Sequence, residues 1–303
     1  MVVTLKKGRA TAVVVPETGG AIATFYWDTD AGERHWLRRP SVPMPDRAGA
    51  MGCFPLVPFS NRVRNGRFEF AGRRVDLPVD AATSPHFEHG HGWRSAWRVV
   101  DSEPARLVMR YEHAADAWPW SYRAEQRVEL DEHMLSCRIA MTNLSSDAMP
   151  MGLGLHPYFP ITPRARLKAG VARYWVADAE VLPVRLADIE PAIDPNGGLA
   201  LAHVDLDTVF TGWRRRARLE WPEWHASLDL LADGPLDFLV IYVPPGAGYC
   251  CVEPVSNMTD AFNFAARGRE DTGLIVLAPG ATVHATVRLM PSLTSSDLKG
   301  TVP

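Results

Sequence analysis

Apolar and polar residues alternate with a period of two along much of this chain. In residues 135–142 and 282–289 every second side chain is apolar, and the residues between are mostly polar. Successive side chains of a β-strand point to opposite faces, so each segment is predicted to be a strand with one buried face. Residues 238–243 form a continuous apolar run closed by Pro-Pro-Gly, which is typical of a strand buried on both faces.

Turn-forming residues separate these predicted strands. The chain spreads 25 prolines and 23 glycines over 303 residues, and Ala71-Gly72 divides residues 67–70 from 73–77 in the pattern of a β-hairpin. We find no long window with the helical spacing of apolar residues. No repeat or shift in composition marks a boundary. We therefore expect an all-β protein with one domain over residues 1–303 and a loose tail at 292–303.

Charge and cysteine content limit the classes of partner. The net charge of -3 provides no clustered positive field of the kind that nucleic acid requires. Four cysteines without a Cys-x-x-Cys motif predict free thiols and a reducing compartment. The apolar run at 12–15 ends at Pro16, which is too short for a signal peptide or a membrane span. The sequence therefore favours a cytoplasmic protein with neither a membrane nor a nucleic-acid partner.

Residues 86–93, His-Phe-Glu-His-Gly-His-Gly-Trp, contain three histidines and two glycines and are unusual for a packed strand. In an extended segment, His89 and His91 would point the same way. Several interpretations stay open. A His-x-His pair on a strand suits a transition metal, two imidazoles can line a polar cleft as hydrogen-bond donors, and a solvated His-rich loop needs no function.

Two other segments place a titratable side chain directly before a proline. His156 follows an apolar strand spaced by glycines and precedes Pro157, and Glu253 follows an apolar run and precedes Pro254. We expect both residues at strand ends, where the chain leaves the sheet and where sites are usually built. Each also has a structural alternative, because a histidine near a core is often only hydrogen-bonded and a carboxylate can pair with an arginine.

Together the three segments favour general acid–base chemistry. A carboxylate base and imidazole acids in one cleft can move protons in opposite directions near neutral pH. The chain has no Gly-x-Ser-x-Gly, no phosphate-binding glycine loop and no dinucleotide-binding fingerprint. Nucleophilic catalysis, phosphoryl transfer and hydride transfer therefore have no support in the sequence.

Five motifs in order, within residues 5–290, make the chain similar to the aldose 1-epimerase (galactose mutarotase-like) family. They are Asn61-Arg62 within residues 53–68, His89-Gly-His-Gly-Trp93 followed by Trp97, Gly154-Leu-His156-Pro-Tyr-Phe159, Asp207-Thr-Val-Phe210, and Val252-Glu253-Pro254 followed by Asp260-Ala-Phe-Asn263. The resemblance implies a large antiparallel β-sandwich, the galactose mutarotase-like supersandwich, with an open cleft.

The same resemblance implies an enzyme that interconverts the α and β anomers of a free aldose without a metal or cofactor. Glu253 would be the base that takes the proton of the anomeric O1 hydroxyl. His156 would be the acid that protonates the ring oxygen, and His89 would hydrogen-bond the same region. The ring would open, the C1–C2 bond would rotate, and the ring would close on either face.

Further residues of these motifs are expected to bind the sugar. Arg62 and Asp207 would hold hydroxyl groups with support from Asn61. His91 adds an imidazole beside His89, and Trp93 offers an apolar ring on which a sugar can stack. The expected partner is a small sugar, and the expected assembly is a monomer or a homodimer.

Three alternatives to a free-aldose mutarotase remain open from the sequence. A carbohydrate-binding protein on the same scaffold would need no acid–base pair. A metal-dependent enzyme would use the three histidines of residues 86–91. A mutarotase of a phosphorylated hexose would need cations for the phosphate, and the chain offers several near the motifs: Arg62, Arg64, Arg67 and Arg94.

Overall fold

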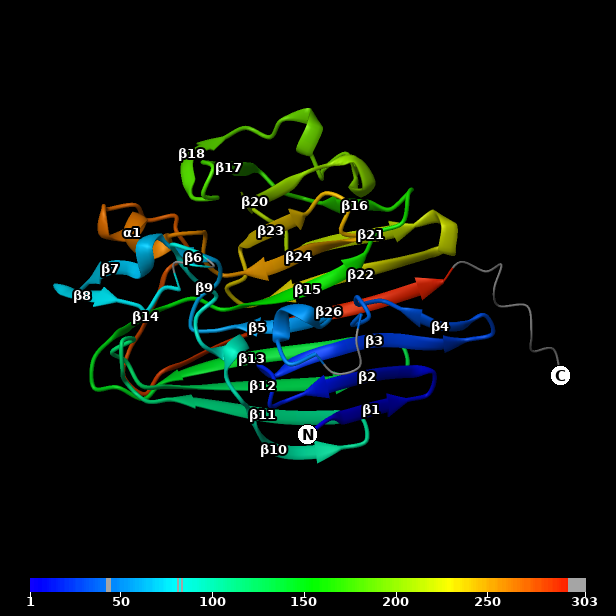
Figure 1. Ribbon diagram of the computed structural model, residues 1–303, viewed down its shortest axis with the longest axis horizontal. Coiled ribbons are helices and arrows are strands. Elements are labelled where there is room, and N and C mark those ends of the chain that lie inside the picture. The colour runs from blue at the N-terminus through cyan, green and yellow to red at the C-terminus, as the bar shows by residue number, and fades with distance from the viewer. Residues whose placement is uncertain (42–44, 81, 83, 294–303) are drawn as a thin grey trace.

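The computed structural model describes residues 1–41, 45–80, 82 and 84–293. Its larger sheet has eleven strands (Figure 1). In spatial order they are β1 (Val3–Lys7), β2 (Ala10–Val15), β3 (Ala21–Thr29), β5 (Cys53–Leu56), β15 (Gly154–Pro160), β24 (Tyr249–Val255), β23 (Phe238–Val243), β20 (Leu206–Thr211), β17 (Arg173–Ala177) and β18 (Pro183–Ala187), with β4 (Gly32–His35) paired to β3. All of these pairings are antiparallel.

A second antiparallel sheet packs against the first. Its nine strands are, in order, β10 (Arg98–Glu103), β11 (Arg106–His113), β12 (Tyr122–Leu130), β13 (Leu135–Asn143), β26 (Thr282–Leu293), β22 (Ala226–Asp233), β21 (Arg216–Trp221), β16 (Arg166–Ala169) and β19 (Leu199–Ala200). The main hydrophobic core draws buried side chains from both sheets, as in a β-sandwich. The prediction of a large antiparallel sandwich is confirmed.

Smaller elements lie to one side of this sandwich. The β7–β8 hairpin (Arg67–Phe70 and Arg73–Asp76) and α1 (Ala261–Ala266) stand together at the left of Figure 1. The remaining short elements are β6 (Arg62–Val63), paired with β9 (Phe87–Glu88), β14 (Met149–Met151), paired with β25 (Ile275–Leu277), and six 3-10 turns: η1 (Ala48–Ala50), η2 (Arg64–Gly66), η3 (Gly92–Arg94), η4 (Pro191–Ile193), η5 (Leu201–His203) and η6 (Pro222–Trp224).

The strands expected from the sequence are present. β13 and β26 contain the two alternating segments, and β23 is the run buried on both faces. The hairpin at Ala71-Gly72 is also confirmed, because both residues have the positive φ (50° and 75°) that a tight two-residue hairpin turn favours. All four cysteines are buried and free.

The expectation of a loose tail at 292–303 is wrong for its first two residues. β26 continues through Leu293, and Ser292 hydrogen-bonds Ser227 of β22 over 2.7 Å, so residues 292 and 293 belong to the sheet. Residues 294–303 lie outside the described residues. None of the helices in the described part of the chain is long and apolar enough to cross a membrane. That residues 1–303 form one domain stays a prediction.

Alternation along the central strands of the large sheet creates two unlike faces. Leu155, Leu239 and Val252 belong to the core between the sheets. Their neighbours one position away, among them Val240 and Cys251, belong to a second apolar cluster. We call the face that carries this second cluster the outer face of the large sheet. Period two thus directs His156, Asp207 and Glu253 away from the sandwich core.

Neither His156 nor Glu253 lies at a strand end, contrary to the expectation from the sequence. His156 is inside β15 and Glu253 is inside β24. The two strands pair at Gly154–Val255 and again at Tyr158–Cys251, with no pairs between. Pro157 and Pro254 lie in this interruption, where a missing N–H breaks no hydrogen bond between the two strands. Both strands therefore continue through their prolines.

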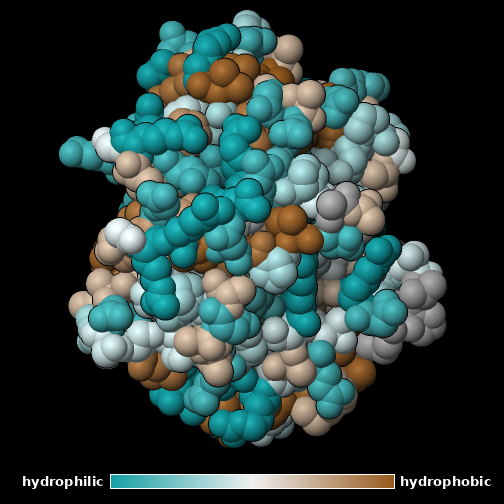
Figure 2. All heavy atoms as spheres, turned by 60° about the vertical axis from the view of Figure 1, so that its left-hand side comes forward, coloured by the Kyte–Doolittle hydropathy of each residue, from teal (hydrophilic) through white to brown (hydrophobic). Residues whose placement is uncertain are grey.

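Figure 2 shows the side of the molecule that lies at the left of Figure 1. Hydrophilic residues dominate this surface, and hydrophobic residues form separate patches, with one at the top of the view where β17 and β18 lie. Val184 of β18 is among the exposed large hydrophobic residues, with 60% of its surface accessible.

Candidate active site

A cavity of about 240 Å³ lies over the outer face of the large sheet. The central strands form its floor, and the chain between β5 and β10 forms its walls. The lining residues are Phe54, Asn61, Arg62, Glu88, His89, Trp93, His156, Tyr158, Asp207, Val240, Tyr242 and Glu253. The structure therefore brings together seven of the eight site residues expected from the sequence, all but His91.

Glu253 and His156 face each other on neighbouring strands. The pairs on either side of the interrupted ladder place them directly opposite, and Nε2 of His156 lies 3.2 Å from Oε1 of Glu253. Both side chains are buried, with 8% and 3% of their surface exposed. Oε2 of Glu253 and Nδ1 of His156 are buried without a hydrogen-bond partner. A buried carboxyl with a free oxygen is costly unless a ligand or solvent supplies the missing hydrogen bond.

Burial dominates the proton affinities of this pair. It raises the pKa of Glu253 well above the ordinary value, with a smaller effect in the same direction from Asp207 and an opposing effect from Arg62. Burial lowers the pKa of His156 to about 3. Both shifts favour the uncharged forms, the carboxylic acid of Glu253 and the neutral imidazole of His156.

A stack of flat groups fixes the ring of His156. The rings of Phe54 and Tyr158 lie 4.5 and 4.7 Å from it, with interplanar angles of 26° and 22°, and their own centroids are 6.1 Å apart. Trp93 continues the stack beyond Phe54, and the guanidinium of Arg38 lies over Tyr158. These contacts hold the imidazole in one plane and keep it desolvated.

His89 is held by Asn61 in a second imidazole position. The N–H of Asn61 donates to Nδ1 of His89 (3.0 Å), and the N–H of His89 donates to the carbonyl of Asn61 (3.0 Å). An accepting Nδ1 leaves the proton of the neutral ring on Nε2, which is then a donor. Burial, followed by the charge of His156, lowers the pKa of His89 well below its ordinary value. His89 is thus a neutral hydrogen-bond donor beside His156.

Arg62 connects two carboxylates on the wall of the cavity. Its Nε lies 3.0 Å from Oε1 of Glu88, and its Nη2 lies 3.5 Å from Oδ2 of Asp207. The side-chain oxygen of Asn61 accepts from both the N–H and Nη1 of Arg62. Asp207 lies in β20 opposite Tyr242, whereas the polar residues before Phe210 suggest a turn in the sequence. Burial raises the pKa of Asp207, while Arg62 opposes that shift.

His91 lies outside the cavity. The chain turns at His89 and Gly90, whose φ values are 60° and 66°, so residues 89–91 do not continue β9. The expectation that His89 and His91 share a strand face is therefore wrong. His91 Nδ1 lies 3.2 Å from the hydroxyl of Tyr122, and its ring stacks on His113.

The three histidines of residues 86–91 do not converge on one ligand position. His86 Nδ1 accepts from the N–H of Asn65, and its Nε2 faces Glu180 at 3.6 Å. His91 does lie near His113 and Asp116, but its ring is nearly parallel to that of His113, at 3°. Lone pairs in two parallel planes cannot both point at one ion, so these two imidazoles do not fit a shared metal.

A second group of possible ligands combines His156 and Glu253 of the cavity with the buried Cys251, and their ligand atoms lie within 4.8 Å of one another. Burial raises the pKa of the Cys251 thiol well above its ordinary value. Metals bind the thiolate rather than the thiol, so an ion held by this set would have to displace the proton of a buried thiol.

Trp93 lines the cavity, but neighbours already cover its ring. Phe54 stacks on it at 5.2 Å, and the guanidinium of Arg94 lies 4.6 Å from its centroid. A sugar that stacks on Trp93 therefore has to compete with Arg94, and contact with the ring edge is easier.

Several lining residues escaped the sequence analysis. Glu88, Phe54, Tyr158, Val240 and Tyr242 belong to the cavity. A buried network also braces the wall, since the side chain of Asn257 accepts from the N–H of Ser60 and donates to its carbonyl. Alternation could have identified Tyr158, because it lies two positions from His156 on the same face of β15. Glu88 carried no such signal.

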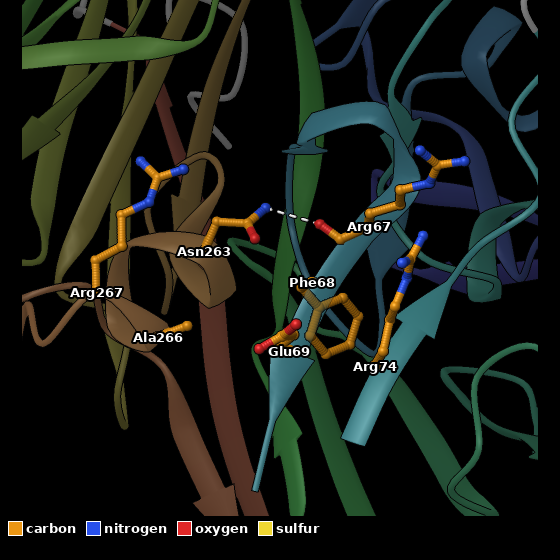
Figure 3. A pocket seen from close by; sticks show the side chains of 7 residues that line it. All are labelled: Arg67, Phe68, Glu69, Arg74, Asn263, Ala266 and Arg267. Carbon is orange, nitrogen blue, oxygen red and sulfur yellow. Dashed lines mark hydrogen bonds between the residues drawn. The ribbon is translucent and has the colours of Figure 1, made fainter. Parts of the chain in front are cut away.

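A second hollow, of about 390 Å³, lies between the β7–β8 hairpin and α1 (Figure 3). Arg67, Arg74 and Arg267 line it together with Glu69 and Asn263, whose amide donates to the carbonyl of Arg67 (2.9 Å). Two of the arginines already pair with Asp76. This hollow contains no buried acid–base pair, so the smaller cavity is the candidate active site.

The fold and the cavity define a protein of the galactose mutarotase-like class. The chain belongs to the aldose 1-epimerase family, whose sequence profile matches residues 1–290. It is 31% identical over 283 residues to the uncharacterized protein YphB of Escherichia coli K12, covering 91% of this chain and 93% of that protein.

Solved structures support the same assignment. A crystal structure named "Putative aldose 1-epimerase" from Escherichia coli K12 has a TM-score of 0.88 and 29% identity, covering 97% of this chain and 99% of that one. A galactose mutarotase-like protein of Clostridium acetobutylicum has a TM-score of 0.85 over 97% and 95% of the two chains. Its identity of 20% supports the fold alone.

Proposed function

We propose that this protein is a cofactor-independent aldose 1-epimerase that interconverts the α and β anomers of a free aldose. The observation that carries the proposal is the buried pair of Glu253 and His156, 3.2 Å apart, each with an unpartnered polar atom in or beside the cavity. A cavity that only bound sugar would need neither a buried carboxyl nor a desolvated imidazole, both of which are costly.

The reaction requires two proton transfers in opposite directions. The carboxylate of Glu253 takes the proton of the O1 hydroxyl, and the electron pair of O1 forms the C1 carbonyl. The bond between C1 and the ring oxygen breaks, and the ring oxygen takes a proton from His156. Rotation about C1–C2 presents the other face of the aldehyde, and the reverse transfers close the ring.

The proton count of the pair suits this cycle. The pair begins as carboxylate and imidazolium and ends ring opening as carboxylic acid and neutral imidazole, so it holds one proton throughout. Burial favours the second, uncharged arrangement. The charged arrangement is therefore the minor form of the empty cavity, and its return to the uncharged arrangement favours both proton transfers once a sugar is bound. His89 supplies a neutral donor to the same region.

Polarimetry tests the proposal directly. A freshly dissolved pure anomer relaxes to equilibrium slowly by itself, and the protein should accelerate that relaxation for at least one aldose of a panel. Saturable binding of a sugar without any acceleration would instead support a non-catalytic carbohydrate-binding protein.

Removal of metal ions should leave the activity unchanged. Opening a hemiacetal needs only proton transfers, which Glu253 and His156 supply. Exhaustive dialysis against a chelator is therefore expected to change neither the rate of anomer exchange nor the melting temperature. Loss of activity that stoichiometric zinc or nickel restores would contradict the proposed mechanism.

Asp207→Asn and Arg62→Ala should weaken sugar binding. Hydrogen bonds to charged groups contribute about 1.5–3 kcal/mol, so the affinity for a saturable sugar should fall roughly 10-fold or more. Burial raises the pKa of Asp207 despite the nearby Arg62, so the folded state disfavours the charged carboxylate. Asp207→Asn should therefore not lower the melting temperature.

Calorimetric titration and thermal melts separate the two possible roles. Asp188→Asn is a suitable control, since that side chain is 99% exposed. Unchanged affinity with a lowered melting temperature in both variants would make Arg62 and Asp207 structural.

A further inference from the structure

The charge of Arg62 is already balanced by protein carboxylates. Glu88 approaches Nε at 3.0 Å and Asp207 approaches Nη2 at 3.5 Å. All three side chains are about three-quarters buried, with exposed fractions of 25%, 25% and 22% for Glu88, Asp207 and Arg62. One guanidinium between two partly desolvated carboxylates leaves this wall with a net negative charge.

The backbone fixes Glu88 in this position. Glu88 pairs with Arg62 in the short β6–β9 ladder, so the two side chains start from neighbouring strands. The indole N–H of Trp93 donates to the carbonyl of Glu88 (3.3 Å). The next residue, His89, turns out of the strand. These contacts therefore fix the backbone of Glu88 beside that of His89.

No other lining residue supplies a fixed positive charge. Burial lowers the pKa of both His89 and His156, so neither imidazole carries a fixed charge in the empty cavity, and Arg62 is the sole Arg or Lys among the described residues that line it. Arg94 lies over Trp93 with an exposed side chain, where solvent screens its charge. Arg38 lies behind Tyr158 and donates to the carbonyls of Gly49 and Met51.

We propose that Glu88 is a specificity-determining residue that restricts the cavity to uncharged sugars. Its carboxylate occupies the side of Arg62 that a phosphate or a sugar carboxylate would otherwise engage, and it repels such a group. Hydroxyl groups are not excluded, because they can donate to Glu88 and Asp207 and accept from Arg62. This inference rests on the proposed anomer exchange and decides between a free and a phosphorylated aldose.

The test compares a neutral aldose with its 6-phosphate and its uronate. Rates of anomer exchange give kcat/KM for the wild type, for Glu88→Gln and for the control Glu69→Gln. Glu69 is an exposed carboxylate in the second hollow, so it undergoes the same chemical change away from the cavity (Figure 3). Calorimetric titration of the same three sugars gives binding independently of turnover.

The wild type should prefer the neutral sugar. Glu88→Gln should shift the ratio of anionic to neutral kcat/KM about 10-fold or more toward the anionic sugars, since one unit charge is removed a few Å from the ligand. Glu69→Gln should leave the ratio unchanged. A wild type that treats both kinds of sugar alike, or a ratio that Glu88→Gln leaves unchanged, overturns the role of Glu88 without touching the proposed function.

If no sugar is exchanged, the proposed function fails and the calorimetric ratios decide the inference. A shift toward anionic sugars in Glu88→Gln then supports the charge selection by Glu88, and equal ratios overturn it.

Discussion

Glu253→Gln is expected to lower kcat for anomer exchange by about 10²–10⁴-fold. Gln keeps the shape of the side chain in β24 and its contact with His156, but it cannot accept the proton of O1. The side chain of Glu253 is 3% exposed, so bulk water cannot readily replace it as the base. Polarimetry with the variant and the wild type at equal concentration measures the loss. Turnover close to that of the wild type would remove Glu253 from the mechanism.

The same variant should not be less stable than the wild type. Because the pKa of Glu253 is raised in the folded state, the folded protein holds this proton more tightly than the unfolded chain does. The resulting stability is present below the ordinary carboxyl pKa and is lost as pH rises through the raised folded value. Gln remains neutral at every pH. Melting temperatures should therefore agree at low pH, and that of Glu253→Gln should be the higher one above the raised pKa.

His156→Ala is expected to lower kcat by about 10²–10³-fold and to raise KM much less. The imidazole acts mainly in the transition state, where the ring oxygen acquires negative charge, so its loss affects turnover more than binding. Steady-state kinetics over a range of sugar concentrations separate the two effects. The exposed His133 provides a control in His133→Ala, which should behave as the wild type.

The alanine variant also leaves a gap beside the rings of Phe54 and Tyr158. His156→Gln fills more of that space and keeps a hydrogen-bond donor, but it lacks a titratable proton. It should be as stable as the wild type and still slow. His89→Ala should lose less activity than His156→Ala, because His89 is held as a neutral donor by Asn61. A larger loss from His89→Ala would exchange the two roles.

Much of the fold followed from alternation and turn residues. Strands such as β13 and β26 have one face in the core, so period two is visible in the sequence. The expectation failed where proline was taken as a strand boundary. Pro157 and Pro254 remain inside β15 and β24 because the ladder between these strands is interrupted there. The sequence alone does not reveal which proline meets an interrupted ladder.

Around the cavity, too, some residues could be identified from the sequence and others could not. Their motifs identified Glu253 and His156 as candidates, and their meeting depends on a register that a single sequence does not specify. His91 was misplaced because positive φ at His89 and Gly90 ends the alternation. Glu88 could not be identified, since it belongs to no sequence motif. Its importance becomes visible only in its ion pair with Arg62, which the structure shows.

The most direct test of the central claim is exchange spectroscopy by NMR on an aldose already at anomeric equilibrium. No net reaction occurs under these conditions, so cross-peaks between the α and β anomeric protons report ring opening and closure alone. We expect the wild type to produce such cross-peaks with at least one neutral aldose, and Glu253→Gln at the same concentration to abolish them. Sugar binding by the folded wild type without exchange cross-peaks for any sugar of the panel would contradict the account.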